Sequence, residues 1–364
     1  MINDTFCCST SKQTLLNVNK KTNDDQYYNK HNILKQNQDE KNEFLKEYNQ
    51  YCENFELIDQ LGKGAESFVF KCRIKNNNKD FALKTIKINE KQKRNIKEYY
   101  ILNKLKNHQI IKLYKLYKNE KENIDFLLLE YAKFGNLIDF KEKLIKRDYF
   151  SESLLCYFSF QILKGLKFCH LQNIAHLDLK PQNIVIDECL NAKLIDFSIA
   201  ICYNNIKYKQ IQLPLCGTNF YIPPEILNSD KIDINDLNKV DLYSLGMVLY
   251  YLAFGSFPFG LNHDDNKQYK KIYKKVMNGL TFGKEKEYYS YSFIDFLKKL
   301  LEPNIKNRIN IDEALNHYWI KGAQILFDEK EKLFNACSFL SELITDHIKN
   351  FNDYLKQNNS DYCF

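Results

Sequence analysis

The chain has 364 residues and a formal net charge of +7, and 44% of its residues are hydrophobic. This length suits one large two-lobed unit with tails, and the apolar content is enough for a core. No stretch of the chain approaches the length of about eighteen apolar residues that a membrane span needs, so we expect no transmembrane helix. The modest basic excess suits a polyphosphate-binding protein, although an ordinary solvated surface is the more common reason for it.

Cysteine usage indicates the compartment. The eleven cysteines include no C-x-x-C pair and no spacing typical of metal ligands. Because the sequence also shows no signal peptide, we expect reduced thiols in a cytoplasmic protein, with a nuclear location not excluded. We expect no nucleic-acid partner.

The two ends of the chain differ from its middle. Residues 1–52 are polar, with seven lysines and seven acidic residues, and they predict a disordered arm because they cannot bury enough surface to offset the entropy of ordering. Residues 321–364 show apolar residues at helical spacing and predict a helical extension. Five lysines against seven acidic residues make this extension acidic, which argues against calmodulin as a partner, since its target helices are usually basic.

A pair of glycines lies in the first structured region. Residues 55–61 and 69–74 are predicted to be strands from their apolar pattern. Gly62 and Gly64 lie between these strands, where a backbone without Cβ atoms can close over phosphate groups. Ser67 stands at the next small position of this loop. A Gly-x-Gly pair alone is also typical of a plain turn.

A lysine lies inside the third predicted strand. Lys84 comes fifteen residues after Val69 and two residues after Ala82. This spacing allows Val69 and Ala82 to clamp a flat ring while Lys84 reaches phosphates. Glu98 lies on the apolar side of a helix predicted over residues 95–105, where a buried carboxylate needs a partner such as Lys84. The alternative is that both charged residues lie on the surface.

The predicted elements divide the central region into two lobes. Three strands are predicted over residues 81–86, 108–114 and 126–132. Together with the first two strands and the helix, they make a small β-rich lobe over residues 53–132. Residues 133–320 are mostly helical. The elements predicted there include a helix over residues 154–172 and short strands over residues 184–186 and 192–195.

Residues 176–183 read His-Leu-Asp-Leu-Lys-Pro-Gln-Asn and bring three groups suited to phosphate chemistry together. The Asp178 carboxylate can accept a proton from a hydroxyl, and the Lys180 ammonium can neutralise a phosphoryl group. The Asn183 amide oxygen can ligate Mg²⁺. Asp196, followed by Phe197, comes directly after the last short strand and offers a carboxylate for the same chemistry.

In this order, the motifs resemble those of eukaryotic Ser/Thr protein kinases, of the calcium/calmodulin-dependent-like or cyclic-nucleotide-dependent-like branch. Residues 216–225 resemble the family's peptide-docking loop, Asp241 its central-helix aspartate, and Arg308 the partner of Glu225. The resemblance implies an α+β, two-lobed protein-kinase-like fold over residues 53–320.

The resemblance also implies ATP and Mg²⁺ as cofactors and assigns a role to each matching residue. The implied catalytic residues are Asp178, Lys180, Asn183, Lys84 and Glu98, with Thr218 as a brace for Asp178 and Lys180. The implied metal ligands are Asn183 and Asp196. The implied nucleotide site consists of Leu61, Gly62, Gly64, Ser67, Val69, Ala82, Lys84, Leu129, Glu130, Ala132, Val185 and Asp196. An apolar spine anchored by Asp241 is implied from Leu102, Leu113, His176 and Phe197.

The implied activity is transfer of the γ-phosphate of ATP to Ser or Thr hydroxyls of protein substrates. One alternative is a pseudokinase scaffold that binds nucleotide or partners without turnover, but every charged group that the chemistry needs is present. Another is a kinase-fold enzyme that acts on small molecules. The intact loop at residues 216–225 argues against that alternative.

One departure from the family concerns activation. Leu177 stands where most members have an Arg that pairs with a phosphate on the activation loop, and residues 199–217 contain no Ser or Thr. Pro214 occupies the place of the phosphothreonine in the cyclic-AMP-dependent relative. We therefore expect activity without Ser/Thr phosphorylation of this loop. Tyr203 and Tyr208 leave tyrosine phosphorylation open.

Other departures concern the metal-binding motif and the substrate. Ser198 replaces the glycine after Asp196-Phe197 and is expected to restrict the backbone there. Tyr243 replaces a tryptophan of the central helix. Basophilic relatives recognise substrate arginines with three carboxylates. In this chain the three corresponding positions hold Gln182, Asn136 and Tyr251. We therefore expect little preference for Arg two or three residues before the acceptor.

Overall fold

A computed structural model describes residues 55–64, 67–75, 78–88, 97–119, 123–145, 150–204, 208–215, 217–261, 268–280, 282 and 287–323. The arm predicted for residues 1–52 lies outside this part of the chain, as does all but the first three residues of the extension predicted for residues 321–364. Both remain predictions.

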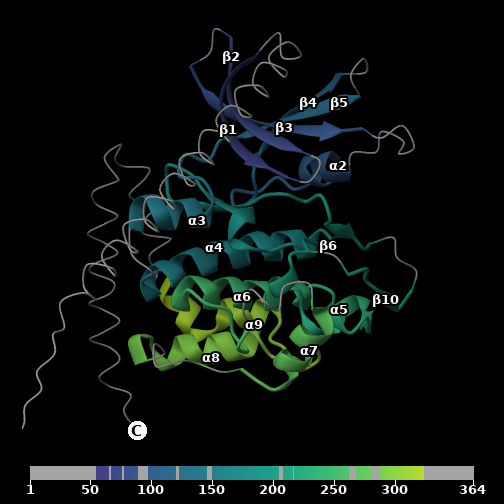
Figure 1. Ribbon diagram of the computed structural model, residues 1–364, viewed down its shortest axis with the longest axis vertical. Coiled ribbons are helices and arrows are strands. Elements are labelled where there is room, and N and C mark those ends of the chain that lie inside the picture. Colours follow the sequence, from purple (N-terminus) through teal and green to yellow (C-terminus); the bar gives the residue numbers. More distant parts are fainter. Residues whose placement is uncertain are drawn as a thin grey trace, which may run out of the picture.

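A five-stranded antiparallel sheet forms the upper lobe in Figure 1, with the spatial order β1-β2-β3-β5-β4. Its strands are β1 (Phe55–Lys63), β2 (Phe68–Ile74), β3 (Asp80–Lys87), β4 (Leu113–Asn119) and β5 (Ile124–Glu130), and helix α2 (Lys97–Lys104) belongs to the same lobe. Successive side chains alternate along β3. Phe81 and Leu83 join the aromatic-rich core of this lobe, whereas Ala82 and Lys84 lie on the opposite face of the sheet.

The strand predicted over residues 108–114 is wrong for most of its length, because β4 begins only at Leu113. Ile110 and Ile111 are buried, but the backbone here pairs with the other lobe: the Ile111 N–H donates to the Leu194 carbonyl, and the Leu194 N–H donates to the Gln109 carbonyl. The apolar run that suggested a sheet strand is therefore buried in the connection between the lobes.

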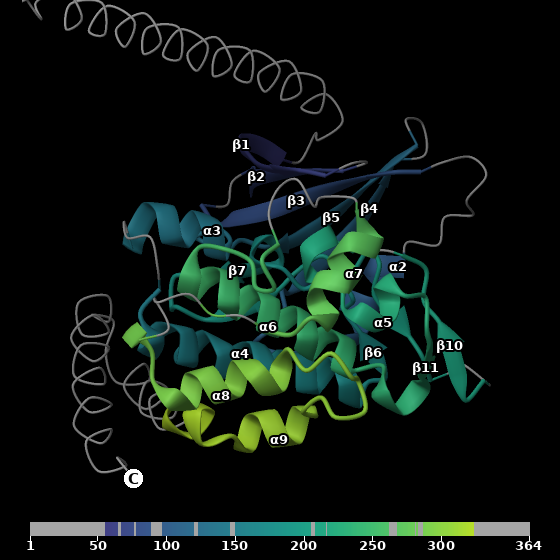
Figure 2. The same ribbon diagram turned by 60° about the horizontal axis from the view of Figure 1, so that its bottom comes forward.

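The lower lobe is built around one long buried helix. Its helices are α3 (Leu137–Phe140), α4 (Glu152–Leu171), α5 (Pro224–Leu227), α6 (Lys239–Phe254), α7 (Tyr269–Met277), α8 (Tyr291–Leu300) and α9 (Ile311–Asn316). Every residue of α6 is buried except Lys239 and Tyr251, as expected for a helix that is apolar on nearly all sides. Helices α4 and α8 pack against α6, and Figure 2 shows the three within the same lobe.

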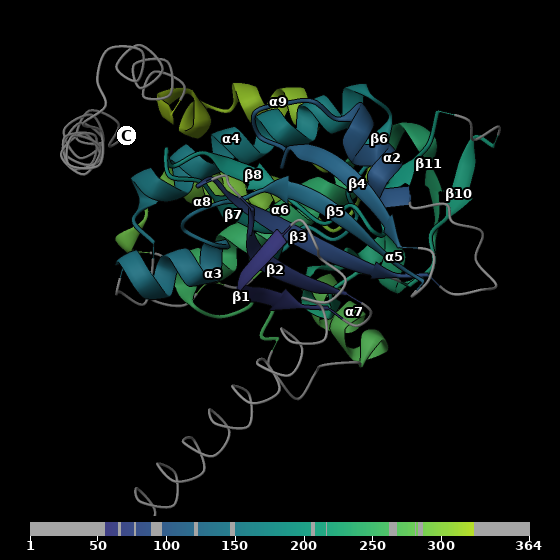
Figure 3. The same cartoon turned by 90° about the horizontal axis from the view of Figure 1, so that it is seen from above.

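The part of the chain after β5 also contains three short strand pairs. The pairs are β6 (Ile174–Ala175) with β9 (Ile201–Cys202), β7 (Ile184–Ile186) with β8 (Ala192–Leu194), and β10 (Gln210–Gln212) with β11 (Lys231–Asp233). In the view from above, β10 and β11 lie side by side at the edge of the helical lobe (Figure 3). The α+β, two-lobed fold predicted from the sequence is confirmed. No helix in the described residues is long and apolar enough to cross a membrane.

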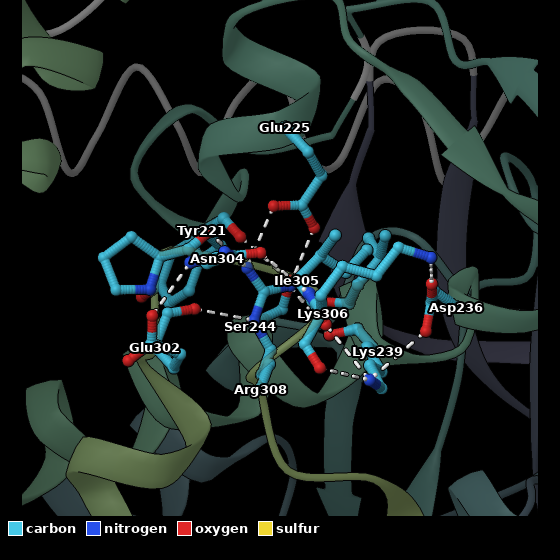
Figure 4. Close-up of polar contacts among 12 residues, drawn as sticks. Tyr221, Glu225, Asp236, Lys239, Ser244, Glu302, Asn304, Ile305, Lys306 and Arg308 are labelled. Carbon is cyan, nitrogen blue, oxygen red and sulfur yellow. Dashed lines mark hydrogen bonds and ion pairs between the residues drawn. The ribbon is translucent and has the colours of Figure 1, made fainter.

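A buried ion pair fixes the base of the helical lobe. Arg308 is only 1% exposed, and its two terminal nitrogens donate to Glu225 Oε1 and Oε2 at 2.7 and 2.9 Å. Its Nε donates to the Glu302 carbonyl at 2.9 Å, and the guanidinium lies 4.9 Å from the ring centre of Tyr243. Figure 4 shows the Arg308 guanidinium facing the carboxylate of Glu225, which lies in α5. The pair therefore holds the end of the peptide-docking loop against the segment before α9.

Replacing Arg308 by Met should lower the free energy of unfolding by about 3–5 kcal/mol, because it leaves the Glu225 carboxylate buried without its cation. Urea denaturation of the purified protein measures this change. The matched control is Arg73→Met, which removes an Arg–Asp80 pair in which the arginine side chain is 44% exposed, and it should change stability by only about 0–1 kcal/mol. Equal effects of the two substitutions would contradict the importance of the buried pair.

Candidate active site

A buried group of charges joins the two lobes. Lys84 Nζ on β3 lies 2.8 and 2.7 Å from the two carboxylate oxygens of Glu98 on α2 and 2.8 Å from Oδ1 of Asp196. Lys84 and Glu98 are 8% and 5% exposed, so the alternative that they are surface residues is wrong. Burial alone would lower the pKa of Lys84, but the charges of Glu98 and Asp196 raise it above its ordinary value. The lysine is therefore held as a cation between the lobes.

Asp196 stays ionised for a related reason. Burial disfavours its charge, but the Lys84 ammonium outweighs burial, and hydrogen bonds from Lys84 and Ser198 add to this, so the pKa of Asp196 falls to about 2. Its backbone has a φ of 63°, in the left-handed region that few residues other than glycine adopt. The expectation that Ser198 restricts this motif remains a prediction.

Asp241 in α6 holds the backbone of residues 176–183, which we name the catalytic loop. Its Oδ2 accepts from the His176 N–H at 2.9 Å and contacts His170 Nε2 at 2.9 Å, while its Oδ1 accepts from the Leu177 N–H at 2.8 Å. Leu177 has a φ of 66°, a conformation that side chains resist. The hydrogen bond from its N–H therefore stabilises a strained turn just before Asp178.

Parts of the predicted spine lie together. The rings of His176 and Phe197 are 4.7 Å apart, and His176 Nε2 lies 2.9 Å from the Ile195 carbonyl. Leu102 and Phe197 belong to the same buried apolar cluster, and Leu113 packs against that cluster. The Asp196-Phe197 segment is thereby linked to the catalytic loop through His176.

The polar groups of the catalytic loop form one network around Asp178. Lys180 Nζ lies 2.8 Å from Asp178 Oδ2 and donates to Thr218 Oγ1 at 2.7 Å, and Thr218 in turn donates to Asp178 Oδ1 at 2.9 Å. Asn183 Nδ2 donates to the Asp178 carbonyl and to Oδ2, at 2.8 and 2.9 Å. The backbone of Gly217 must lie close to the loop, since a Cβ atom there would meet the Leu177 carbonyl at 3.0 Å. Cys216, the residue before Gly217, lies outside the described residues.

The two predicted metal ligands lie at the end of the β7–β8 hairpin. Ile184 pairs with Leu194, and the Ile195 N–H donates to the Asn183 carbonyl at 3.0 Å. Asn183 therefore lies directly before one strand of this hairpin, and Asp196 lies two residues after the other strand, at the same end of the pair. Because the Asn183 amide nitrogen is engaged with Asp178, its side-chain oxygen is the atom left for a cation. One carboxylate and one amide oxygen suit Mg²⁺, which is usually completed by substrate phosphates and water. In the described part of the chain, no cluster of three or more His, Cys, Asp or Glu residues could hold a metal.

The residues predicted around the nucleotide come from both lobes. In the sheet, Val69 pairs with Lys84 and Ala82 pairs with Leu129, so these four side chains lie on adjacent strands. Asn136 forms a bridge with Val185, which joins β7 to the segment that follows β5. The structure therefore gathers these predicted residues at the junction of the lobes.

The backbone on either side of this junction is fixed by hydrogen bonds. The Glu130 N–H donates to the Lys112 carbonyl at 2.9 Å, and the Gly135 N–H donates to the Ala132 carbonyl at 3.2 Å. In the glycine-rich turn, the Gly64 N–H donates to the Ser67 carbonyl at 2.7 Å. Leu61 and Gly62 belong to β1, with Gly62 paired to Val69 of β2, and Leu61 is 42% exposed.

Comparison with known proteins agrees with this geometry. A sequence profile of the protein kinase domain matches residues 55–320. The chain belongs to the protein kinase family. Human death-associated protein kinase 2 is 31% identical over 282 residues, which cover 73% of this chain and 71% of that protein. Serine/threonine-protein kinase 17A of Oryctolagus cuniculus is 32% identical, over 76% of this chain and 68% of that protein. Calcium-dependent protein kinase 5 of Plasmodium berghei (strain Anka) is 35% identical, over 71% and 44%.

The predicted activity is therefore confirmed: this is an ATP-dependent protein Ser/Thr kinase, and the pseudokinase alternative is not favoured. The relatives are consistent with the calcium/calmodulin-dependent-like branch. The family as a whole acts on proteins and uses ATP with Mg²⁺.

Sequence reasoning missed a buried lysine of this kinase that contacts the last residue of β5. Lys193 on β8 is 6% exposed; its Nζ lies 3.2 Å from Glu130 Oε1 and donates to the His108 carbonyl at 2.9 Å. It thereby ties the end of β5 to the helical lobe. The signal in the sequence was a lysine in the middle of a short apolar strand, where a buried cation needs a partner.

Changing Glu98 to Gln should lower kcat/KM for ATP about ten- to a hundredfold, because Lys84 then loses a charged hydrogen-bond partner while the shape of the site is kept. Steady-state kinetics at varied ATP concentration measures the effect. The control is Glu56→Gln, the same chemical change at an exposed position of β1, and it should leave kcat/KM unchanged. Unaltered ATP kinetics in the Glu98 variant would argue that the ion pair has no role in nucleotide use.

Proposed function

We propose that this kinase phosphorylates Ser and Thr hydroxyls of proteins through the network around Asp178, with Asn183 and Asp196 as its Mg²⁺ ligands. The observation that carries the proposal is the contact of one carboxylate, Asp178, with Lys180, Thr218 and Asn183. These contacts orient Asp178, whose side chain is 12% exposed and so remains accessible to a substrate hydroxyl.

Bound ATP with its Mg²⁺ would supply the phosphoryl group and part of the charge neutralisation. Asp178 orients the substrate hydroxyl and receives its proton as the oxygen bonds to the γ-phosphorus and the bond to the β-phosphate oxygen breaks. Lys180 lies beside the transferring group and offsets its negative charge. Lys84, held by Glu98, contacts the nucleotide phosphates from the other lobe. We also propose a cytoplasmic location, in which the cysteines stay reduced.

Turnover should depend on Asp178. The purified full chain should transfer phosphate from ATP to a generic protein substrate, and Asp178→Asn should lower kcat by at least about a hundredfold, since a proton acceptor is lost from an otherwise unchanged site. Nucleotide binding, measured by calorimetry, should be the same in both proteins. Equal and negligible turnover of the two proteins, with nucleotide still bound, would favour the pseudokinase alternative.

We further propose that the activation segment, in its described residues 199–204, 208–215 and 217, is held in place without a phosphate. Leu177 is 5% exposed and belongs to an apolar cluster with Leu213 of this segment, also 5% exposed. The other buried members of this cluster are Ala175, Ile222, Ile226, Ile232, Leu237 and Val240. Burying one leucine contributes about 1.5–3 kcal/mol, which is similar to a hydrogen bond with a charged group. An apolar contact can thus replace the phosphate–arginine pair of other family members.

Backbone pairing adds to this anchoring. Gln210, Ile211 and Gln212 pair with β11, and the Ile234 N–H donates to the Lys209 carbonyl at 3.0 Å. Both elements of the pair lie in the helical lobe, so the segment before the peptide-docking loop is fixed at several points. This supports an activation segment that is ordered by its own sequence.

Phosphatase treatment should therefore leave the activity of this kinase unchanged. In contrast, Leu213→Ala should lower kcat about tenfold or more and make the segment more sensitive to limited proteolysis, since it removes a buried side chain from the apolar cluster that contains Leu177. The control in the same segment is Tyr208→Phe, which removes a phosphate acceptor whose residue is 76% exposed and should have no effect. Loss of activity after phosphatase treatment, with the lost phosphate mapped to residues 199–217, would show this proposal to be wrong.

A further inference from the structure

Thr85 places a buried hydroxyl on the strand that also carries Lys84. The residue is completely buried, and its Oγ1 accepts a hydrogen bond from the Phe68 N–H at 2.9 Å. A buried hydroxyl requires a partner of this kind. Valine or isoleucine would suit a buried strand position at least as well as threonine, so packing alone does not explain the hydroxyl at this place.

The hydrogen bond lies where the backbone pairing of β2 with β3 ends. The two strands are neighbours in the upper lobe (Figure 1), and the first pair of their register is Val69 opposite Lys84. One step further along both strands, Phe68 comes opposite Thr85. The threonine hydroxyl thus supplies an acceptor from β3 for the Phe68 N–H, one step beyond the ladder.

Phe68 is the first residue of β2 after the glycine-rich turn. On the side of β1, the Gly64 N–H donates to the Ser67 carbonyl at 2.7 Å, and Lys63 comes opposite Phe68. Because the N–H groups of successive strand residues point to alternate sides, the Phe68 N–H points away from β1 and toward β3. A Cβ atom at Gly64 would lie only 2.8 Å from Ser67 Oγ, so the two arms of the turn lie close together. The position of both arms therefore follows from that of Phe68.

Thr85 connects this turn with the charged group between the lobes. Lys84 and Thr85 are consecutive, so their side chains leave β3 on opposite faces of the sheet. On one face, Lys84 Nζ is held by Glu98 and by Asp196, both within 2.8 Å. On the other face, Thr85 holds the first residue of β2. One short piece of strand thus fixes both the cation for the nucleotide phosphates and the backbone that closes over them.

We propose that Thr85 is a positioning residue for ATP, whose hydroxyl fixes the glycine-rich turn relative to Lys84 and so sets the affinity for the triphosphate. Thr85 acts through the Phe68 backbone and not through the nucleotide itself. The proposal rests on the ATP-dependent kinase activity described above and adds a residue to its machinery. Phosphoryl transfer depends largely on how well the groups around the phosphates are positioned, so a small displacement of the turn is enough to change ATP use.

Thr85→Val in the full chain tests the proposal, because it keeps the shape of the side chain and removes the acceptor. Calorimetry should show an affinity for ATP with Mg²⁺ that is lower by about five- to fiftyfold, since a buried N–H loses its partner. Adenosine, which has no phosphates, should bind both proteins equally. The KM for ATP should rise by the same factor as the affinity falls, with the KM for a generic protein substrate unchanged. Thr85→Ser retains the hydroxyl and should bind ATP within about twofold of the unaltered kinase. The control is Ser159→Ala, which removes an equally buried hydroxyl that donates to the Leu155 carbonyl in α4, and it should leave ATP affinity unchanged.

A measurement on the unaltered protein guards against a folding defect in the valine variant. Without nucleotide, the amide proton of Phe68 should exchange with solvent much more slowly than in an unstructured peptide, as followed by NMR. Equal losses of affinity for ATP and adenosine in Thr85→Val, failure of Thr85→Ser to retain ATP binding, or a freely exchanging Phe68 amide would each overturn the proposal. An unaltered chain that binds no ATP would instead contradict the kinase activity itself.

Discussion

The carboxylate of Asp241 is the interaction on which the geometry of the active site depends. It is completely buried, and burial opposes its charge, yet its interaction with His170 and the hydrogen bond from the backbone N–H of His176 hold its pKa below the usual value. A buried charge is tolerated only when it is fully paired. Here the partners include two backbone groups of the catalytic loop, so α6 and that loop keep one relative position. The position of Asp178 follows from this pairing.

Leu177 links this anchor to the activation segment. Its N–H binds Asp241, while its side chain lies in the apolar cluster that contains Leu213. The strained backbone of Leu177 and the order of the segment thus depend on the same residue. In a kinase with arginine at this place, the order of the segment would depend on an added charge. On the proposal made above, it depends in this chain on apolar packing, which is present as soon as the protein folds.

Much of the fold and the site could be predicted because the functional groups stand at characteristic spacings. The catalytic loop, Lys84, Glu98 and Asp196 are brought together as the sequence suggested, since strand alternation and helix periodicity place them on facing surfaces. The strand predicted over residues 108–114 failed because a buried apolar run carries no information about which lobe buries it. Lys193 was missed for a related reason, since its partners Glu130 and His108 are distant in sequence. For Tyr251, the sequence indicated only a missing carboxylate, whereas the rings around it became visible in three dimensions.

Two departures from the family follow the same physical rule. In relatives, the place of Leu177 holds an arginine that pairs with a phosphate, and the place of Tyr251 holds a carboxylate that binds a substrate arginine. In this chain each is replaced by an uncharged side chain that packs against other apolar groups. Interactions between exposed charges weaken over roughly 8–10 Å at physiological salt, whereas apolar contacts are short-ranged and little affected by moderate salt. On the proposal made above, order in the activation segment therefore depends on shape and burial. Control of this kinase by a phosphate on residues 199–217 would need a charged partner, and the side chain of Leu177 offers none.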